Sequence, residues 1–554
     1  MRLRRPVVHV ETLLLLGALY LLLACNGPFW RAALAGRGWD APATWGFAGA
    51  LLAILVAFHV ALAGLVATRH TVRPLLTVLI LVAAAASFYM DRYAIYFDRA
   101  MLRNILATDV REARELLGWS LALHLLLFGL LPAALLWWPR LKYRGLVRAA
   151  TVRLAWVACA LVVGSGSLWL VFADFASLMR NQREVRHLMT PGNLVAALAG
   201  NTWGRVKRTQ EAKTSVGADA VPGPAWQARA RPVLFVLVVG ETARAQNFSL
   251  NGYGRETNPQ LARRGVINFP LVTACGTSTE VSLPCMFSPF GRVRYDEEKI
   301  LTHESLLHVL ARAGFNVLWR DNQSGCKGVC SGLPAEQLDH AGVESICAEG
   351  QCLDEVLLHG MDSVLRDTQG NLFVVMHQLG SHGPAYFKRY PAVFKRFTPA
   401  CEREDLRHCN AGEIVNAYDN SLLYTDFFLS RVIDFLDQAQ TTHDTAMLYL
   451  SDHGESLGDN GLYLHGMPYA IAPDVQKHVP MLMWLSPAFR RSFLVDDGCM
   501  RGRARLAASH DNLFHSVLGV LDIETRDRDA AQDLFAPCRP ARGVTAPSPA
   551  ENRH

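Results

Sequence analysis

Long apolar runs separated by short basic loops occupy the first 175 residues. The first run ends near Cys25, and four more follow at 45–67, 74–89, 117–138 and 154–172. Each is close to the ~20 apolar residues that cross a bilayer. A signal peptide or a lipoprotein leader would account for the first run alone. The runs that follow it favour a five-helix transmembrane domain over residues 1–175.

The basic residues indicate how these helices are oriented. Arg2, Arg4 and Arg5 precede the first run, and the loops 69–73 and 140–153 are also rich in arginine. Basic loops stay on the cytoplasmic side of a membrane. Five spans that start inside therefore place the C-terminal half of the chain outside.

A polar segment at residues 91–116 interrupts the apolar pattern. It is too polar for lipid, yet its composition favours a helix in which Asn104, Thr108 and Glu112 recur every four residues and share one face. Such a face at the membrane surface could bind a lipid head group. An ordinary amphipathic connector would show the same spacing, so both interpretations stay open.

The pattern changes after the last run. Residues 176–231 are expected to form an interfacial helix followed by a flexible linker, which contains VGADAVPGPAW. From residue 232, short apolar runs alternate with helical stretches. This alternation predicts a mainly parallel sheet with helices on both faces, in a domain over 232–540. The runs lie at 233–239, 315–319, 372–376 and 446–450, and the tail 541–554 is expected to be disordered.

Charge and cysteine content narrow the function. The net charge of +6 is modest, and no basic patch with interleaved aromatic residues suggests nucleic acid as a partner. Ten of the twelve cysteines fall between residues 275 and 538, mostly in close pairs, which suggests local disulfides in an oxidising compartment. A zinc-binding cysteine cluster is less well supported, because the repeated CxxC spacing is missing. The close pairs are Cys275/Cys285, Cys326/Cys330, Cys347/Cys352 and Cys401/Cys409, which leaves Cys499 and Cys538.

Potential metal ligands follow two of the apolar runs. Glu241 comes directly after VLFVLVVG, and Asp452 and His453 come after AMLYLS. The carboxyl ends of parallel strands meet at one edge of a sheet, so these side chains should converge. With a hydroxyl oxygen, two carboxylates and an imidazole make a four-coordinate zinc site.

Three hydroxyl residues, Thr277, Ser278 and Thr279, lie between Cys275 and Cys285. A bound cation would make one of them a nucleophile. A surface Ser/Thr loop with a structural disulfide is the alternative for this run alone, and spacing does not choose among the three.

Further polar residues follow the remaining strand-like runs. His382 lies in HQLGSHGP, His465 in GLYLHG, and Ser324 and Lys327 in DNQSGCKGV. Two imidazoles and an ammonium group beside an activated hydroxyl suit an anionic phosphoryl group. His377, at the end of a run, is expected only to orient other groups.

Several motifs together carry a resemblance to a known family. They are VVGETARAQNFSLNGYGRETNP, CGTSTEVSLPCMFS, DNQSGCKGV, HQLGSHGP, NAYDNSLLYTD and SDHGESLGDNGLYLHG. With its membrane helices, the whole chain resembles the phosphoethanolamine transferases of Gram-negative inner membranes. These lipid A-modifying enzymes include the mobile colistin-resistance type and belong to the alkaline phosphatase/sulfatase superfamily.

The resemblance implies specific roles. Thr279 would be the nucleophile, a choice that rests on its place in the motif. His382 and His465 would hold the phosphoryl group or a second zinc ion, and Lys327 and Ser324 would contact the substrate phosphate. Asn104, Thr108 and Glu112 would contact the phosphatidylethanolamine head group. The ligands of one tightly bound zinc ion would be Glu241, Thr279, Asp452 and His453.

The expected protein is therefore a monomer with a multi-pass α-helical membrane domain. Its second domain would be a periplasmic α/β domain with an alkaline phosphatase/sulfatase-like central sheet. Phosphatidylethanolamine would be the donor and lipid A the acceptor, with polymyxin resistance as the consequence. One residue departs from the family pattern: Gln323 stands where some relatives have Asn. Only part of the family shares the Cys326/Cys330 pair.

Four alternatives remain. The acceptor could be a core sugar or another periplasmic glycan. A sulfatase or phosphodiesterase would use water, but the C/S-x-P-x-R pattern of sulfatases is missing around Thr279. A glycerol-phosphate transferase of the lipoteichoic acid type would not be expected to carry so many disulfides. An inactive membrane sensor would not need an intact set of Glu241, Thr279, Asp452 and His453.

Overall fold

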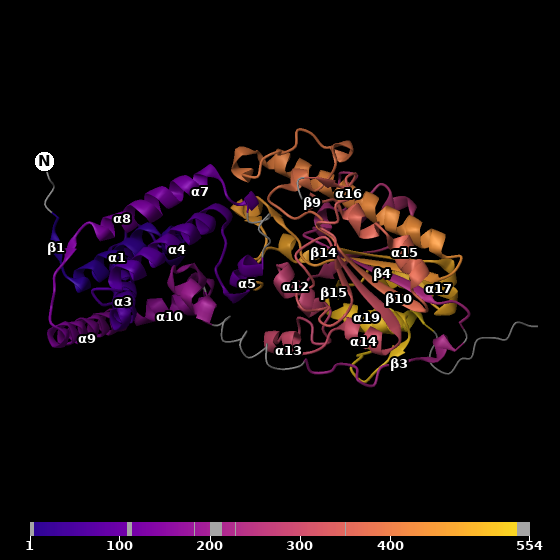
Figure 1. Cartoon of the computed structure of the whole chain (residues 1–554), viewed down its shortest axis with the longest axis horizontal. Coiled ribbons are helices and arrows are strands. Elements are labelled where there is room, and N and C mark those ends of the chain that lie inside the picture. The colour runs from indigo at the N-terminus through magenta and orange to yellow at the C-terminus, as the bar shows by residue number, and fades with distance from the viewer. Residues whose placement is uncertain are drawn as a thin grey trace, which may run out of the picture. The chain divides into compact units, whose positions relative to one another are not determined.

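The computed structural model describes residues 5–107, 114–181, 183–199, 213–227, 229–348 and 351–539. Contacts divide the chain into a membrane unit, 1–106 with 113–206, and an α/β unit, 107–112 with 207–554. Each unit is described by itself (Figure 1). Thr108, Glu112 and the tail 541–554 lie outside the described residues.

The membrane unit consists of long apolar helices. Within the described residues, four are long and apolar enough to cross a membrane, or five if a bent pair counts as one span. The bent pair is α1 (Val10–Ala24) with α2 (Gly27–Ala33), at 67° to each other. The four are α3 (Pro42–Val66), α4 (Val72–Tyr93), the continuous stretch Trp119–Trp137 and α9 (Leu146–Leu170). That stretch contains α7 (Trp119–His124), the π-helical turn η1 (Leu125–Leu130) and α8 (Leu131–Trp137).

Exposure and packing of α9 explain why it suits a bilayer. Leu154 is 71% exposed and Trp169 80%, and no residue of α9 is buried. A helix that is apolar all round and exposed belongs in lipid rather than in water. Small residues bring α9 close to α3: a Cβ added at Gly164 would lie 3.0 Å from the Ala57 Cβ. Such close approach is typical of helix pairs in membranes.

The expected interfacial helix is broken into three pieces. They are α10 (Phe172–Asn181), the 3-10 turn η2 (Arg183–Leu188) and the helical residues 192–199. Pro191 lies at the second break, where its ring and missing N–H cannot continue a helix. The buried Asn26 holds this break, because its Oδ1 accepts the backbone N–H of Thr190 and its Nδ2 donates to the Thr190 carbonyl, both at 2.8 Å. The membrane unit also contains α5 (Arg99–Ala107) and the short pair β1 (Val7–Val8) and β2 (Arg140–Leu141).

An eight-stranded sheet forms the centre of the α/β unit. In spatial order its strands are β15 (Ala508–Ser509), β5 (Ile267–Thr273), β14 (His478–Leu485), β11 (Asp444–Ser451), β4 (Val233–Gly240), β10 (Asn371–His377), β6 (Phe315–Asp321) and β7 (Ala335–Gln337). The four apolar runs predicted as strands are β4, β6, β10 and β11, and they pair in parallel. β14 runs antiparallel to both of its neighbours, so the sheet is mixed. The expected fold class is confirmed.

Helices cover both faces of this sheet (Figure 1). α16 (Ala411–Ala439) and α15 (Met361–Asp367) lie on one side, and α14 (Leu306–Arg312) and α19 (Asp511–Val520) on the other. Every residue of β4 is buried, because side chains that alternate between the faces meet helices on each. This explains why the run reads as continuously apolar. The remaining helices are α12 (Thr279–Met286), α13 (Glu297–Thr302), α17 (Pro487–Ser492) and α18 (Asp497–Arg503).

The second half of the expected linker packs on the α/β unit instead of hanging free. β3 (Val221–Pro222) pairs with β16 (Ile523–Glu524), and Val216 is buried in the core. The Trp226 indole Nε1 donates to the Leu521 carbonyl at 2.7 Å. Burying such apolar side chains stabilises a fixed position, so composition alone overstated the flexibility of this segment.

One buried acid of α16 should make stability depend on pH. Asp426 accepts the backbone N–H groups of Gln260 and Leu261, each at 2.9 Å, and burial raises the pKa of its carboxyl to about 7. An exposed Asp has a pKa of about 3.9, so the contribution of Asp426 to stability is full below about pH 4 and is lost as the pH rises through about 7. We expect Asp426→Asn to lessen the fall in Tm of the full chain in detergent between about pH 5 and pH 7. Equal slopes in the two proteins would contradict this.

Candidate active site

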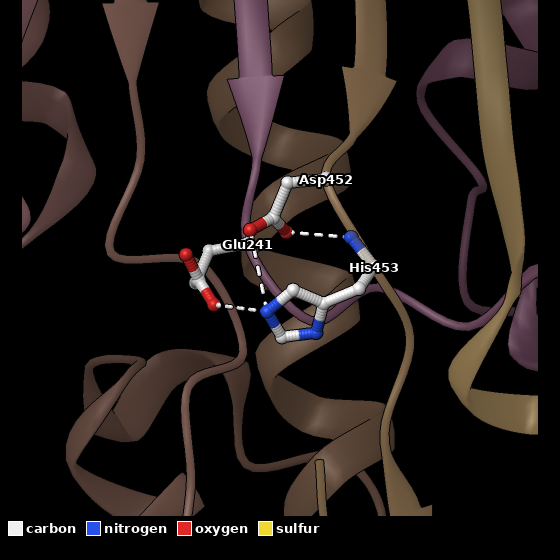
Figure 2. A group of neighbouring side chains, drawn as sticks. All are labelled: Glu241, Asp452 and His453. Carbon is white, nitrogen blue, oxygen red and sulfur yellow. Dashed lines mark hydrogen bonds and ion pairs between the residues drawn. The ribbon is translucent and has the colours of Figure 1, made fainter. Parts of the chain in front are cut away.

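The ends of β4 and β11 bring three ionisable side chains together. The sheet pairs Gly240 with Ser451, so the residues that follow them, Glu241 and Asp452 with His453, lie side by side. Figure 2 shows the three side chains pointing toward one another. One ligand atom from each lies within 4.8 Å of the others, and all three residues are buried. The structure thus brings together the predicted metal ligands.

The hydrogen bonds of His453 make this group suited to hold a cation. His453 Nδ1 lies 2.9 Å from the Gly454 carbonyl, which can only accept, so Nδ1 carries a proton. His453 Nε2 then faces Glu241 Oε1 and Asp452 Oδ2, each at 3.3 Å. In a neutral imidazole its lone pair would point at two buried carboxylates, and a bound cation relieves that repulsion. Asp452 Oδ2 accepts no hydrogen bond from the described residues, which leaves it available to a metal ion.

The Thr279 hydroxyl completes the group. Its Oγ1 lies 3.0 Å from Glu241 Oε2 and 3.3 Å from His453 Nε2. Thr277 Oγ1 donates instead to the Met467 carbonyl at 2.6 Å. Thr279 is the first residue of α12, where the helix dipole favours negative charge. Carboxylate, imidazole and hydroxyl donors are ligands that zinc takes, so the residues present fit that ion.

Five disulfides hold the loops of the α/β unit. They are Cys275–Cys285, Cys326–Cys330, Cys347–Cys352, Cys401–Cys409 and Cys499–Cys538. The first four are the close pairs expected from spacing. Cys275–Cys285 closes the loop that carries Thr279, and within that loop Gly276 N–H donates to Ser282 Oγ at 2.8 Å.

Removing the disulfide beside Thr279 should lower turnover more than its small contribution to stability suggests. Chain entropy predicts a loss of about 3 kcal/mol for Cys275→Ser with Cys285→Ser, and about 4 kcal/mol for Cys499→Ser with Cys538→Ser, which frees a longer loop. We expect the first double variant to show the larger loss of turnover and the second the larger loss of stability. Denaturant unfolding and turnover, assayed where both variants are folded, test this. If the Cys499/Cys538 variant lost more than the Cys275/Cys285 variant in both turnover and stability, the first disulfide would have no role in placing Thr279.

The loop after β6 carries an amide and an ammonium group toward the site. Gln323 Nε2 donates to Glu241 Oε2 at 3.3 Å, so glutamine does make a contact here. Lys327 Nζ donates to Ser324 Oγ at 2.7 Å and lies 3.9 Å from Glu280 Oε2, on the residue next to Thr279.

The two predicted histidines lie on one side of this group. The ring centroid of His465 is 4.4 Å from that of His453 and 5.3 Å from that of His382. Burial, followed by the nearby charge of His465, lowers the pKa of His382 well below its usual value, so His382 is neutral at pH 7. A neutral imidazole can donate one hydrogen bond to a phosphoryl oxygen without a charge of its own.

Glu455 is a site residue that the sequence analysis missed. It is buried, accepts a hydrogen bond from the Tyr386 hydroxyl at 2.7 Å, and lies 2.8 Å from His465 Nδ1. A carboxylate on Nδ1 fixes the ring and leaves Nε2 toward the site. The only signal in the sequence was a carboxylate three residues after Asp452.

His377 and Asn104 complete the predicted set. His377 Nδ1 lies 2.9 Å from Asp321 Oδ2, and its Nε2 is 4.0 Å from Glu241 Oε2, which suits an orienting role. Burial opposes charge on His377, but the Asp321 carboxylate overrides it and raises the pKa of His377. Asn104 lies on α5 of the membrane unit and is half-buried.

Known proteins resemble the whole chain. A family model described as phosphoethanolamine transferase EptA/EptB matches residues 54–203, and a sulfatase model matches residues 234–523. Phosphoethanolamine transferase EptA of Escherichia coli (strain K12) is 39% identical over 554 residues, which cover 97% of this chain and 98% of the relative. Phosphatidylethanolamine transferase Mcr-2 of Escherichia coli is 38% identical over 550 residues, 95% of this chain and 98% of the relative. The integral membrane protein lipooligosaccharide phosphoethanolamine transferase A (EptA) from Neisseria meningitidis aligns with a TM-score of 0.91 at 36% identity, over 96% of this chain and 99% of that chain.

Proposed function

This chain belongs to the phosphoethanolamine transferase family, and we propose that it transfers phosphoethanolamine from phosphatidylethanolamine to a phosphate of lipid A. Its α/β unit also belongs to the sulfatase family. The reaction would pass through a phosphoethanolamine group carried on Thr279. The observation that carries this proposal is the Thr279 hydroxyl, 3.0 Å from Glu241 in a buried group of metal-binding residues. The donor named for Mcr-2 and the lipooligosaccharide named for the Neisseria protein support the two substrates.

Glu241, Asp452, His453 and Thr279 would hold one zinc ion. Zinc, when bound, lowers the pKa of a hydroxyl in contact with it and offsets charge on a phosphoryl group. His382 and His465 would hold the phosphoryl group or a second zinc ion. The set with Glu241, Asp452, His453 and Thr279 would carry the phosphoryl transfer, because it contains the nucleophile.

The chain's own residues account for both halves of the transfer. The deprotonated Thr279 Oγ1 attacks the phosphorus of phosphatidylethanolamine, and the bond from phosphorus to the diacylglycerol oxygen breaks. Diacylglycerol leaves with a proton, which balances the one lost by Thr279, and His465, whose ring centroid is 4.4 Å from that of His453, would supply it. The neutral His382 would instead donate a hydrogen bond to a phosphoryl oxygen. A lipid A phosphate oxygen then attacks the same phosphorus, and the bond to Thr279 breaks. Lys327 and Ser324 would bind the phosphoryl oxygens in both halves.

The chain's architecture supports a place in the bacterial inner membrane with the α/β unit in the periplasm. Basic loops on one side of the apolar helices give the orientation, and five disulfides require an oxidising compartment. Asn104, Thr108 and Glu112 would contact the donor head group, a role that rests on their helical spacing and on the family resemblance. The working protein would be a monomer.

The product has a direct electrostatic consequence. Each ethanolamine ammonium group reduces the negative charge of lipid A. Cationic peptides are attracted to such a surface by its charge, so polymyxin and colistin would bind less well.

Mass spectrometry of lipid A tests the proposal. Wild type and Thr279→Ala are expressed in a polymyxin-sensitive host, and the lipid A is extracted and weighed. A phosphoethanolamine-sized gain with the wild type alone is the expected result. Unchanged lipid A beside a modified core sugar or periplasmic glycan would move the acceptor, and no modification anywhere would overturn the transfer.

A further inference from the structure

Two strand-end loops carry the residues proposed to bind the phosphoryl group. The loop after β6 holds Ser324 and Lys327, and the loop after β10 holds His382. β6 and β10 are neighbours in the sheet, but the sheet stops at Asp321 and His377. Beyond these residues, something other than the strand ladder must fix the loops relative to each other.

A single buried carboxylate joins the two loops. Asp354 begins the 3-10 turn η7 (Asp354–Leu358) and is only 3% exposed. Its Oδ1 accepts from Asn322 Nδ2 at 2.9 Å and from the Leu379 N–H at 2.8 Å. Its Oδ2 accepts from Gln378 Nε2 and from the Gly380 N–H, both at 3.1 Å. One side chain therefore takes four N–H donors, one from the first loop and three from the second.

The same loop is packed against the backbone of Glu241. The Ser381 N–H donates to the Glu241 carbonyl at 3.1 Å. A Cβ added at Gly380 would lie 2.7 Å from that carbonyl oxygen, and Gly380 has a φ of +57°, so only glycine suits this close approach. A shift of the second loop would thus move both His382 and the backbone that carries a proposed metal ligand.

Four N–H donors on one side chain require a carboxylate. Each carboxylate oxygen can accept two hydrogen bonds, whereas an amide offers one oxygen and presents N–H groups on its other side. Asparagine at 354 would turn its own N–H donors toward two of these four N–H groups. The site would have to open to relieve that contact.

We propose that Asp354 is a positioning residue for the transfer reaction: it holds the loops after β6 and β10 together, and so places His382 against the phosphoryl group that Lys327 and Ser324 bind. This inference rests on the proposed function. The four hydrogen bonds of Asp354 go to residues of the two loops, so its effect passes through the loops.

Asp426 provides a matched control for Asp354. It is also a buried aspartate with backbone N–H donors, and it lies on α16, which carries none of the proposed site residues. Asp354→Asn and Asp426→Asn both lose acceptors for buried donors and should both lose stability. Only Asp354→Asn should slow the chemistry.

A double-mutant cycle separates positioning from loss of stability. The full chain in detergent micelles receives saturating phosphatidylethanolamine, and the rate of adduct formation on Thr279 is followed by intact-protein mass spectrometry. Asp354→Asn is expected to slow this rate on the order of 100-fold, the cost of a misplaced catalytic group. In a His382→Ala background, Asp354→Asn should slow adduct formation by less than about 10-fold, because the effects of two residues that act through each other do not add. Asp426→Asn should change the rate by less than about 3-fold in either background.

Three outcomes would overturn the proposal. The first is that Asp354→Asn slows adduct formation by the same factor with and without His382. The second is that Asp354→Asn slows it no more than Asp426→Asn does. The third is that a higher donor concentration restores the rate of Asp354→Asn in full. If Asp354→Asn does not fold, Gln378→Ala, which removes one of the four donors, is put through the same cycle with the same criteria. Wild type without any adduct on Thr279 would overturn the proposed function and this inference with it.

Discussion

Thr279→Ala is expected to form no phosphoethanolamine adduct and to lower turnover by at least about 10⁴-fold, the scale seen when a covalent nucleophile is removed. The reason is geometric. Thr279 Oγ1 lies 3.0 Å from Glu241 Oε2 and 3.3 Å from His453 Nε2. No adduct on Thr277 should replace it, since Thr277 Oγ1 is turned to the Met467 carbonyl. Intact-protein mass spectrometry after incubation with phosphatidylethanolamine measures the adduct.

Two controls sharpen this experiment. Thr279→Ser keeps a hydroxyl at the start of α12 and should still form an adduct. Thr277→Ala loses a buried hydrogen bond, with a cost of about 1–3 kcal/mol in stability, but keeps the nucleophile and should also form one. An adduct of normal yield in Thr279→Ala would show that another residue is the nucleophile.

Asp452→Asn is expected to lose the tightly bound metal together with activity. An amide in place of the carboxylate removes one charge from a buried group in which His453 Nε2 faces two carboxylates. Partners outside the ligand sphere cost 10–100-fold in metal affinity when removed, so a ligand should cost more than about 100-fold. Elemental analysis of purified protein and zinc titration after chelation measure the effect.

Asp444→Asn is the control for Asp452→Asn. Asp444 lies at the opposite end of β11, where its Oδ2 is 3.6 Å from Arg229 Nε. The variant should lose stability, because it leaves a buried guanidinium without its counter-ion, yet keep its metal. Zinc added after chelation should restore the wild type and Asp444→Asn, but not Asp452→Asn. Full metal content in Asp452→Asn would rule out the proposed ligand set.

The sheet and the metal group could be predicted because local sequence records them directly. β4 and β11 are buried on both faces and read as unbroken apolar runs, and the acids that follow stand where parallel strands end. β14 was not predicted, and neither was its antiparallel direction, which depends on how the chain returns to the sheet.

Other parts of the site depend on contacts that spacing does not record. The choice of Thr279 over Thr277 follows from where α12 begins, and without the family motif it could not be made. Glu455 can be recognised as a site residue only in the folded chain, where it contacts His465. Asp354 lies more than twenty residues from both Asn322 and Gln378, in a stretch with no strand or helix period. Trp226 looked like part of a flexible linker because its place in the core is formed by residues near 521.

The order of the cysteines bears on how the α/β unit acquires its disulfides. All five disulfides join cysteines that are consecutive along the α/β unit, from Cys275 with Cys285 to Cys499 with Cys538. A chain threaded through a translocation channel from its N-terminal side presents each such couple before the next emerges. An oxidant that simply couples thiols in their order of arrival would then produce the native set, and maturation would need no disulfide isomerase.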